Sequence, residues 1–339
     1  MTNLNKILSL NLLEIGYVSG SSRTVLLPPL NASANKGELI AVIGRNGIGK
    51  STLLRTMTGL QEPLGGEIYY DGRGIRGYSR TDLARKVGYI STETVKVTNM
   101  SVYDLVSLGR YPHTNWFGKI SLIDHDKILD ALEKTAMSAF RDRLISELSD
   151  GERQKTMIAR ILAQDTDIMV MDEPTAFLDI GSKYEIFHLL HQLSQKGKKT
   201  IIFSTHDLQM AISQSDKIWL ILDNQLREGA PEDLMIDGAF DHLFESSSLH
   251  FNSETGTFSF MEEEKNSFYI EGDGVEKHWT EEAVKRAGFS ISATKTTPYI
   301  KVISGTMNSW KVISEKQEKA FSSIYDLISG LVENDHISI

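Results

Sequence analysis

Gly44-Arg45-Asn46-Gly47-Ile48-Gly49-Lys50-Ser51-Thr52 decides the fold of this chain, because it has the spacing G-x-x-x-x-G-K-[ST] of a phosphate-binding loop. The apolar run 38–43 before it predicts a buried strand, and residues 50–57 after it predict a helix. Glycines in this loop let the backbone turn N–H groups toward phosphate oxygens, and the helix N-terminus adds positive partial charge. We therefore expect a nucleoside triphosphate here, with Lys50 at its β- and γ-phosphates and the Ser51 hydroxyl as a Mg²⁺ ligand.

Two adjacent carboxylates, Asp172 and Glu173, follow the four apolar residues 168–171. A central parallel strand delivers such residues to the C-terminal edge of its sheet. Asp172 is expected to hold Mg²⁺ through its water shell, and Glu173 to orient and polarise the water that attacks the γ-phosphate. A solvated turn is the alternative for this pair taken alone, but its place beside a phosphate loop favours catalysis.

Three more short sites accompany these two within a little over two hundred residues: Leu148-Ser149-Asp150-Gly151-Glu152, Phe177-Leu178-Asp179 and Ser204-Thr205-His206-Asp207. Together the five resemble the ATP-binding cassette of ABC transporters, and the resemblance covers about residues 8–230. It implies an α/β P-loop NTPase fold with a mixed sheet core and a helical subdomain, and ATPase activity that requires Mg²⁺. The residues that the resemblance assigns to ATP are Gly44, Asn46, Gly47, Gly49, Lys50, Ser51 and Thr52.

The resemblance also assigns roles to two isolated side chains. His206 would contact the γ-phosphate and help Glu173 to position water, so Glu173, His206 and Lys50 form the expected catalytic set. Tyr17 would stack on adenine, which offers a π-face without demanding directional bonds. The alternatives are a satisfied structural histidine and an ordinary half-buried strand tyrosine.

Only one cassette is present, and the sequence has no internal repeat. In the family, the loop at 148–152 caps the γ-phosphate that a second cassette binds. The resemblance therefore implies a head-to-tail homodimer, in which Ser149 and Gly151 complete the ATP site of the partner and Asp179 crosses the interface. The same stretch also predicts the N-cap of a helix over 152–163, and both interpretations can hold.

The chain departs from the family pattern at two sites. Asp150 and Glu152 replace the more usual Gly and Gln of the signature. Because an acid facing a triphosphate would repel it, we expect Asp150 to turn away or toward a cation such as Arg153. Thr92 stands where the family carries a glutamine that touches Mg²⁺ and couples hydrolysis to the membrane subunit. Its hydroxyl is still a candidate metal ligand, and Glu93 is the alternative for part of that role.

The stretch 104–118, with Gly109-Arg110-Tyr111-Pro112, is similar to importers for iron–siderophore complexes, haem and cobalamin. That branch implies a transmembrane permease, indirectly a periplasmic or surface substrate-binding protein, and a peripheral place on the cytoplasmic face of the inner (plasma) membrane. In that branch the helical segment around residues 102–140, within the helical subdomain expected at about 95–165, receives a coupling helix of the permease. Tyr111, Trp116 and Phe117 are expected to form an exposed apolar contact there, with internal packing as the alternative.

Charge divides the chain near Gly229-Ala230-Pro231. Residues 231–339 carry 19 Asp or Glu and 9 Lys or Arg, so this tail accounts for the net charge of −9. We expect a cassette at 1–230 and an acidic C-terminal α+β accessory domain at 231–339. The acidic tail argues against nucleic-acid binding, and no apolar run reaches the ~20 residues that span a bilayer. The absence of cysteine excludes disulfide chemistry.

Short apolar runs in the tail predict strands at 256–261, 268–271, 289–293, 299–303 and 310–313, and helices at 280–287 and 319–331. Gly272-Asp273-Gly274 is interpreted as a turn, because the third glycine of a dinucleotide-binding loop is absent. The main functional alternative is a regulatory or soluble ABC-type nucleotide-binding protein with weak turnover and no transport role. Thr92 and Asp150 motivate it, whereas Glu173 and His206 oppose it.

Overall fold

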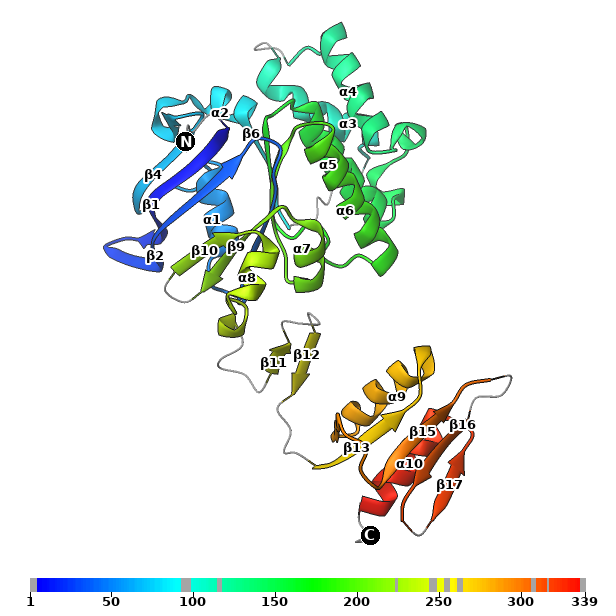
Figure 1. Cartoon of the computed structure of the whole chain (residues 1–339). Coiled ribbons are helices and arrows are strands. Elements are labelled where there is room, and N and C mark those ends of the chain that lie inside the picture. Colours follow the sequence, from blue (N-terminus) through cyan, green and yellow to red (C-terminus); the bar gives the residue numbers. More distant parts are fainter. Residues whose placement is uncertain are drawn as a thin grey trace. The chain divides into compact units, whose positions relative to one another are not determined.

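The computed structural model describes residues 5–92, 99–114, 118–222, 225–243, 249–252, 257–260, 265–305, 309–315 and 317–335. The chain divides into two compact units, whose elements are labelled in Figure 1. The first comprises Met1–Ser247 with Phe251–Phe258, and the second comprises Ser248–His250 with Ser259–Ile339. The first unit therefore includes α8 (Pro231–Ile236), which lies beyond the charge boundary near Pro231.

A six-stranded sheet forms the centre of the first unit, in the order β10-β9-β3-β8-β7-β6. All neighbours are parallel except β10 and β9. The strands are β3 (Leu39–Gly44), β6 (Val87–Ile90), β7 (Ile168–Met171), β8 (Thr200–Ser204), β9 (Lys217–Leu222) and β10 (Gln225–Gly229). Every residue of β3, β7 and β8 is buried, as their continuous apolar sequences predict. Because parallel strands end at one edge, the segments that follow β3, β6, β7 and β8 meet there.

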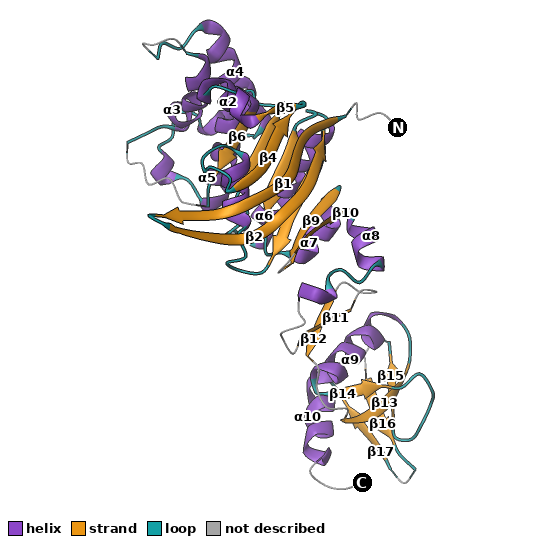
Figure 2. Cartoon of the chain, turned by 90° about the vertical axis from the view of Figure 1, so that its left-hand side faces the viewer, coloured by secondary structure: helices purple, strands orange, loops and turns teal. Residues whose placement is uncertain are grey.

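A four-stranded antiparallel sheet packs over one face of this central sheet, in the order β2-β1-β4-β5. Its strands are β1 (Lys6–Ser19), β2 (Ser22–Asn35), β4 (Gly65–Tyr70) and β5 (Arg73–Gly74). Helix α1 (Lys50–Met57) shares its core, where Leu53 and Met57 pack with Ile40 and Val42 of β3. Figure 2 shows β1, β2 and β4 as one curved layer.

Helices α5 (Asp150–Ala163), α6 (Ile180–Gln195) and α7 (Leu208–Gln214) cover the opposite face, toward which Leu39 and Ala41 of β3 point (Figure 1). Helices α3 (Val102–Ser107) and α4 (Leu122–Lys134) pack on α5. Capping boxes that start at Ser101, Ser121 and Ser149 fix the beginnings of α3, α4 and α5. The remaining short elements are α2 (Arg80–Lys86), η1 (Ile75–Gly77), η2 (Leu108–His113), η3 (Ser138–Phe140), η4 (Ile145–Glu147) and η5 (Asp241–Leu243).

The second unit is a five-stranded sheet in the order β14-β13-β15-β16-β17, with two helices. Its elements are β13 (Lys265–Glu271), α9 (Gly274–Arg286), β14 (Phe289–Ile291), β15 (Tyr299–Ile303), β16 (Ser309–Ile313), β17 (Glu318–Phe321) and α10 (Ile324–Asp335). Buried Trp310 donates its indole N–H to Thr280 Oγ1 of α9 at 2.8 Å, which ties the helix to the sheet. A separate pair, β11 (Leu249–Asn252) and β12 (Thr257–Phe260), precedes it. The expected α+β class is confirmed.

Two details of the predicted tail are wrong. The helix expected over 319–331 begins only at Ile324, because residues 318–321 pair with β16 as the edge strand β17. Ser323 accepts the backbone N–H of Asp326 at 3.0 Å and so marks the true start of the helix. The other helix begins at Gly274, six residues before the expected start at Thr280, so it includes the last residue of the predicted Gly-Asp-Gly turn.

Candidate nucleotide-binding site

The phosphate loop connects the end of β3 to the start of α1. Gly47 and Gly49 have φ angles of 78° and 115°, a region that strains residues with a Cβ. Gly49 is the N-cap of α1 and supplies no side-chain cap, so the first N–H groups of the helix are left for another acceptor. Lys50 Nζ donates to Gly44 O at 2.8 Å and to Arg45 O at 3.2 Å. The loop thus surrounds an ammonium group and helix N–H donors, which is what phosphate oxygens require.

Burial and nearby carboxylates have opposite effects on the pKa of the Lys50 ammonium. Only 6% of the residue is exposed. Burial lowers its pKa below the ordinary lysine value, although the charges of Glu173 and Asp172 act in the opposite direction. The phosphate loop and the two carboxylates therefore act on one another across the same sheet edge.

Ser204, a residue that the sequence analysis did not single out, organises the two carboxylates. It is the last residue of β8 and is fully buried. Its hydroxyl donates to Asp172 Oδ1 at 2.7 Å and accepts the backbone N–H of Glu173 at 2.9 Å. The sequence gives one indication of this role, because a buried hydroxyl at the end of an apolar strand needs hydrogen-bond partners.

Glu173 and His206 lie in direct contact. Glu173 follows β7 with a φ of 50°, an uncommon backbone conformation for a residue with a side chain. His206 Nε2 lies 2.5 Å from Glu173 Oε1, and both side chains are partly exposed. A carboxylate can only accept, so this ring nitrogen donates. The residues after β7 and β8 therefore present an acid and an imidazole together at the edge that also carries Lys50.

Thr92, two residues after β6, also reaches this edge. Its hydroxyl donates to Asp172 O at 3.2 Å, so the side chain touches the Asp172 backbone. Ser91 and Thr92 line a cavity together with Glu173, Asp150 and Arg153. This cavity lies between the end of β6 and the start of α5. Glu93 lies outside the described residues.

Tyr17 of β1 reaches the start of α1. Its phenol oxygen lies 2.6 Å from Thr52 Oγ1, and about half of the residue is exposed. The hydroxyl is therefore anchored on the helix that follows the phosphate loop, while part of the ring stays open to solvent. Such a ring can stack on a flat heterocycle.

The signature forms the beginning of α5. Ser149 Oγ accepts the Glu152 N–H at 3.3 Å and donates to Glu152 Oε2 at 2.8 Å. Hydrogen bonds from Ser149 lower the pKa of Glu152, so this acid is ionised. Asp150 Oδ1 accepts from Arg153 Nη1 at 2.7 Å, the expected turn of this acid toward a cation. The N-cap expected from the sequence is therefore present at Ser149.

Gly151 and Asp179 both lie next to Ser182 of α6. Asp179 is the N-cap of α6 and accepts from the Ser182 backbone at 3.0 Å and from its hydroxyl at 2.7 Å. A Cβ on Gly151 would lie 3.0 Å from Ser182 Oγ. The structure therefore brings Ser149, Gly151 and Asp179 together as a second group of predicted residues.

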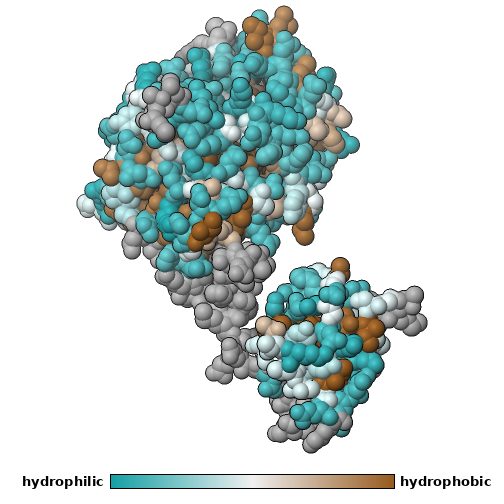
Figure 3. Space-filling view, viewed as in Figure 1, coloured by the Kyte–Doolittle hydropathy of each residue, from teal (hydrophilic) through white to brown (hydrophobic). Residues whose placement is uncertain are grey.

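The segment expected to contact a permease exposes apolar side chains. Tyr111 is 76% exposed and so does not pack internally, whereas Trp116 and Phe117 lie outside the described residues. Leu122 and Ile123 at the start of α4 are 85% and 70% exposed. Figure 3 shows an apolar patch over the tip of the helical region, on an otherwise mainly hydrophilic face. In the part of the chain that the structure describes, no helix has the length and apolar character needed to cross a bilayer.

Two family models match the chain: "ABC transporter" over residues 27–176 and "Iron ABC transporter C-terminal domain" over residues 265–332. A probable siderophore transport system ATP-binding protein of Bacillus subtilis is 35% identical over 238 residues, which cover 70% of this chain and 85% of that protein. An inward-facing transporter described as metal-chelate type aligns with a TM-score of 0.59 at 30% identity, over 68% of this chain and 85% of the other. The dimeric structure of a bacterial ABC transporter cassette aligns with a TM-score of 0.58 at 25% identity, over 66% and 99%.

Proposed function

This chain belongs to the ABC transporter family as one of its ATPase cassettes, and we propose that it powers the import of an iron–siderophore chelate through a partner permease. The observation that carries the proposal is the joint presence of Lys50, Glu173 and His206 at one sheet edge, in a chain whose C-terminal unit matches an iron-transport family. That second match favours an iron chelate over cobalamin, which the motifs around Arg110 left open.

We propose that ATP binds along the path from Tyr17 to Lys50. The adenine would stack on the exposed part of the Tyr17 ring, and the phosphates would lie in the loop formed by Gly44, Asn46, Gly47 and Gly49, with Thr52 beside them. Lys50 would exchange its bonds to the loop carbonyls for phosphate oxygens, which a buried cation binds more strongly than it binds neutral carbonyls.

The residues expected around Mg²⁺ fit that ion. Ser51, Asp172 and Thr92 offer oxygen donors alone, which hard divalent cations prefer. Ser204 already fixes the Asp172 carboxylate through Oδ1. When bound, Mg²⁺ would neutralise charge on the β- and γ-phosphate oxygens.

Hydrolysis would follow from the Glu173–His206 pair. Glu173 would accept a hydrogen bond from water and direct its oxygen in line toward the γ-phosphorus, while the bond to the β–γ bridging oxygen breaks and leaves ADP and phosphate. His206 would contact the γ-phosphate and, through the contact of its Nε2 with Glu173 at 2.5 Å, fix the orientation of Glu173. Lys50 would stabilise the charge that develops on the departing ADP oxygen.

We propose that two copies act together, head to tail. Ser149 and Gly151 would complete the ATP site of the second copy, and Asp179 would lie across the interface. A solved cassette at 25% identity is dimeric, which supports the pairing of two copies. The permease would contact the exposed segment around Tyr111, and the chain would then lie on the cytoplasmic face of the membrane.

Steady-state phosphate release by the purified chain and by Glu173→Gln tests the proposal against a regulatory module. The proposal expects hydrolysis that falls at least about 100-fold in the variant, because the group that polarises water is lost while ATP binding remains. Equal, low phosphate release by both proteins with intact ATP binding would favour the regulatory module.

A further inference from the structure

Helix α5 connects the signature at its amino end to the segment η2 at its carboxyl end. Its 14 residues begin at the signature and end at Ala163, a length of about 21 Å at 1.5 Å per residue. From Thr156 to Ala163 all residues except Arg160 are buried. No glycine or proline follows Gly151 within it, so the helix moves as one body rather than bending.

The carboxyl end of α5 is held by side chains of η2. The last carbonyls of a helix have no partners within that helix and accept from elsewhere. Arg110 Nη1 donates to Ala163 O at 2.7 Å, and His113 Nε2 donates to Gln164 O at 2.9 Å. A cation at this position also suits the negative end of the helix dipole. Arg110 and His113 thus bind the carboxyl end of α5, the helix that begins at the signature.

Gly109 allows the backbone of η2 to pack directly against the backbone of α5. A Cβ at this position would lie 2.1 Å from Arg160 O, closer than any side chain can approach a carbonyl oxygen. Glycine therefore lets η2 lie against the last turn of α5. The contact between η2 and α5 consists of close backbone packing and two short hydrogen bonds. A displacement of η2 would therefore move α5 with it.

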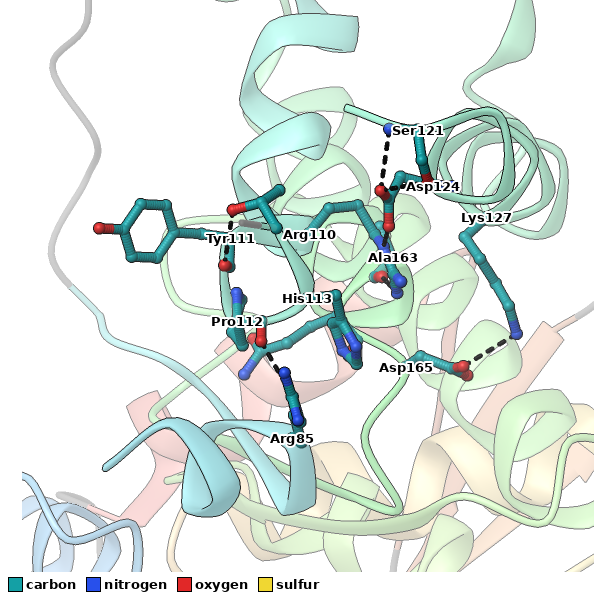
Figure 4. Close-up of polar contacts among 12 residues, drawn as sticks. Arg85, Arg110, Tyr111, Pro112, His113, Ser121, Asp124, Lys127, Ala163 and Asp165 are labelled. Carbon is teal, nitrogen blue, oxygen red and sulfur yellow. Dashed lines mark hydrogen bonds and ion pairs between the residues drawn. The ribbon is translucent and has the colours of Figure 1, made fainter. Parts of the chain in front are cut away.

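Arg110 also joins the start of α4 to the same point, as Figure 4 shows. Its Nε donates to Asp124 Oδ1 at 2.8 Å, and 4% of Arg110 is exposed. Asp124 Oδ2 accepts from the Ser121 backbone and hydroxyl at 3.0 and 2.6 Å, which closes the cap of α4. The start of α4 and the end of α5 are therefore fixed to one guanidinium.

The outer side of this assembly is apolar and exposed. Tyr111 stands between the two donors in the sequence and points away from them in Figure 4, and Leu122 and Ile123 directly precede Asp124 on α4. We infer that Arg110 and His113 are positioning residues that transmit movement of a docking surface, formed by Tyr111, Leu122 and Ile123, to the signature through α5. This inference rests on the proposed function, because it takes the permease to bind that surface.

The test uses His113→Ala, because removal of Arg110 would leave the buried Asp124 unpaired and threaten folding. The full chain is reconstituted in proteoliposomes with a candidate iron–siderophore permease from its own genome, and ATPase is measured with and without that permease. We expect the basal rate and the KM for ATP of His113→Ala to stay within twofold of the unmodified chain, while stimulation by the permease falls at least fivefold. His113→Gln, whose amide Nε2 can donate to the same carbonyl, should restore stimulation.

Lys127→Ala is the matched control. It breaks a 2.8 Å ion pair to Asp165 in the same region without touching the last α5 carbonyls, and stimulation should persist. Stimulation of His113→Ala equal to that of the unmodified chain would overturn the inference alone. Equal loss of basal and stimulated rates would also overturn it, since that result marks a purely structural role. Absence of stimulation in the unmodified chain would instead refute the proposed function, and the inference with it.

Discussion

Ser204→Ala is the substitution that most directly tests how the carboxylates are organised. It removes a hydroxyl that donates to Asp172 Oδ1 at 2.7 Å and accepts from the Glu173 backbone at 2.9 Å. The first bond, to a charged group, is worth about 1.5–3 kcal/mol, and the second about 1 kcal/mol. Because the group is fully buried, water does not replace it, and the free energy of unfolding should fall by about 2.5–4 kcal/mol.

The larger consequence concerns the rate of hydrolysis. If the bond to Asp172 is needed to hold both carboxylates in the transition state, its loss lowers kcat by roughly 10–100-fold. The affinity for ATP should change less than threefold, because Ser204 is not part of the phosphate loop.

The assay combines phosphate release, ATP titration and urea unfolding. Ser194→Ala is the control, since it truncates a similarly buried serine whose hydroxyl donates to His191 O at 3.1 Å within α6, away from the carboxylates. A kcat for Ser204→Ala within twofold of the unmodified chain, at a temperature where both are folded, would refute this reasoning.

Three further changes have defined outcomes. Tyr17→Ala should weaken ATP binding by about tenfold and Tyr17→Phe by much less, since base stacking is worth roughly 1–3 kcal/mol, and nucleotide titration of both variants decides this. Lys50→Met should weaken ATP binding by at least roughly tenfold in the same titration, because it removes the buried cation from the phosphate loop. Burial raises the pKa of Asp124, but bonds from Ser121 and the Arg110 charge outweigh it and lower that pKa to about 2. The stability that Asp124 adds is therefore complete above about pH 4 and lost as the pH falls through 2, and urea unfolding of Asp124→Asn should lack this acid dependence.

The parts of the fold that carry motifs could be predicted from sequence. The runs before Lys50, Asp172 and His206 are mainly apolar and short, and each is a buried parallel strand that ends one to six residues before the predicted side chain. Periodicity sufficed there because these strands are buried on both faces, so tertiary context and local sequence agree.

Residues that depend on tertiary partners could not be predicted. Residues 319–321 read as helix from their spacing with Ile324 and Ile328, yet they pair with β16, and no local signal identifies an edge strand. Ser204 gains its importance only from Asp172 and Glu173, which lie more than 30 residues away in the chain. Gly109 likewise reads as a motif glycine, and only the packing of η2 on α5 shows the reason for it.

The departures from the family signature also have local explanations. Asp150 is neutralised by Arg153, and Glu152 completes the cap of α5 with Ser149. These acids therefore serve the helix that carries the signature. Thr92 keeps contact with the Asp172 backbone through its hydroxyl, which maintains a link between β6 and the catalytic edge.

The most direct test of the central claim is iron uptake by proteoliposomes that contain this chain and a candidate iron–siderophore permease from its own genome. The substrate is a radiolabelled ferric siderophore with its binding protein, and ATP is supplied on the cassette side. The account predicts ATP-dependent accumulation that Glu173→Gln abolishes and that rises with the ATPase rate. Accumulation that is independent of ATP, or equal with the unmodified chain and Glu173→Gln, would contradict it.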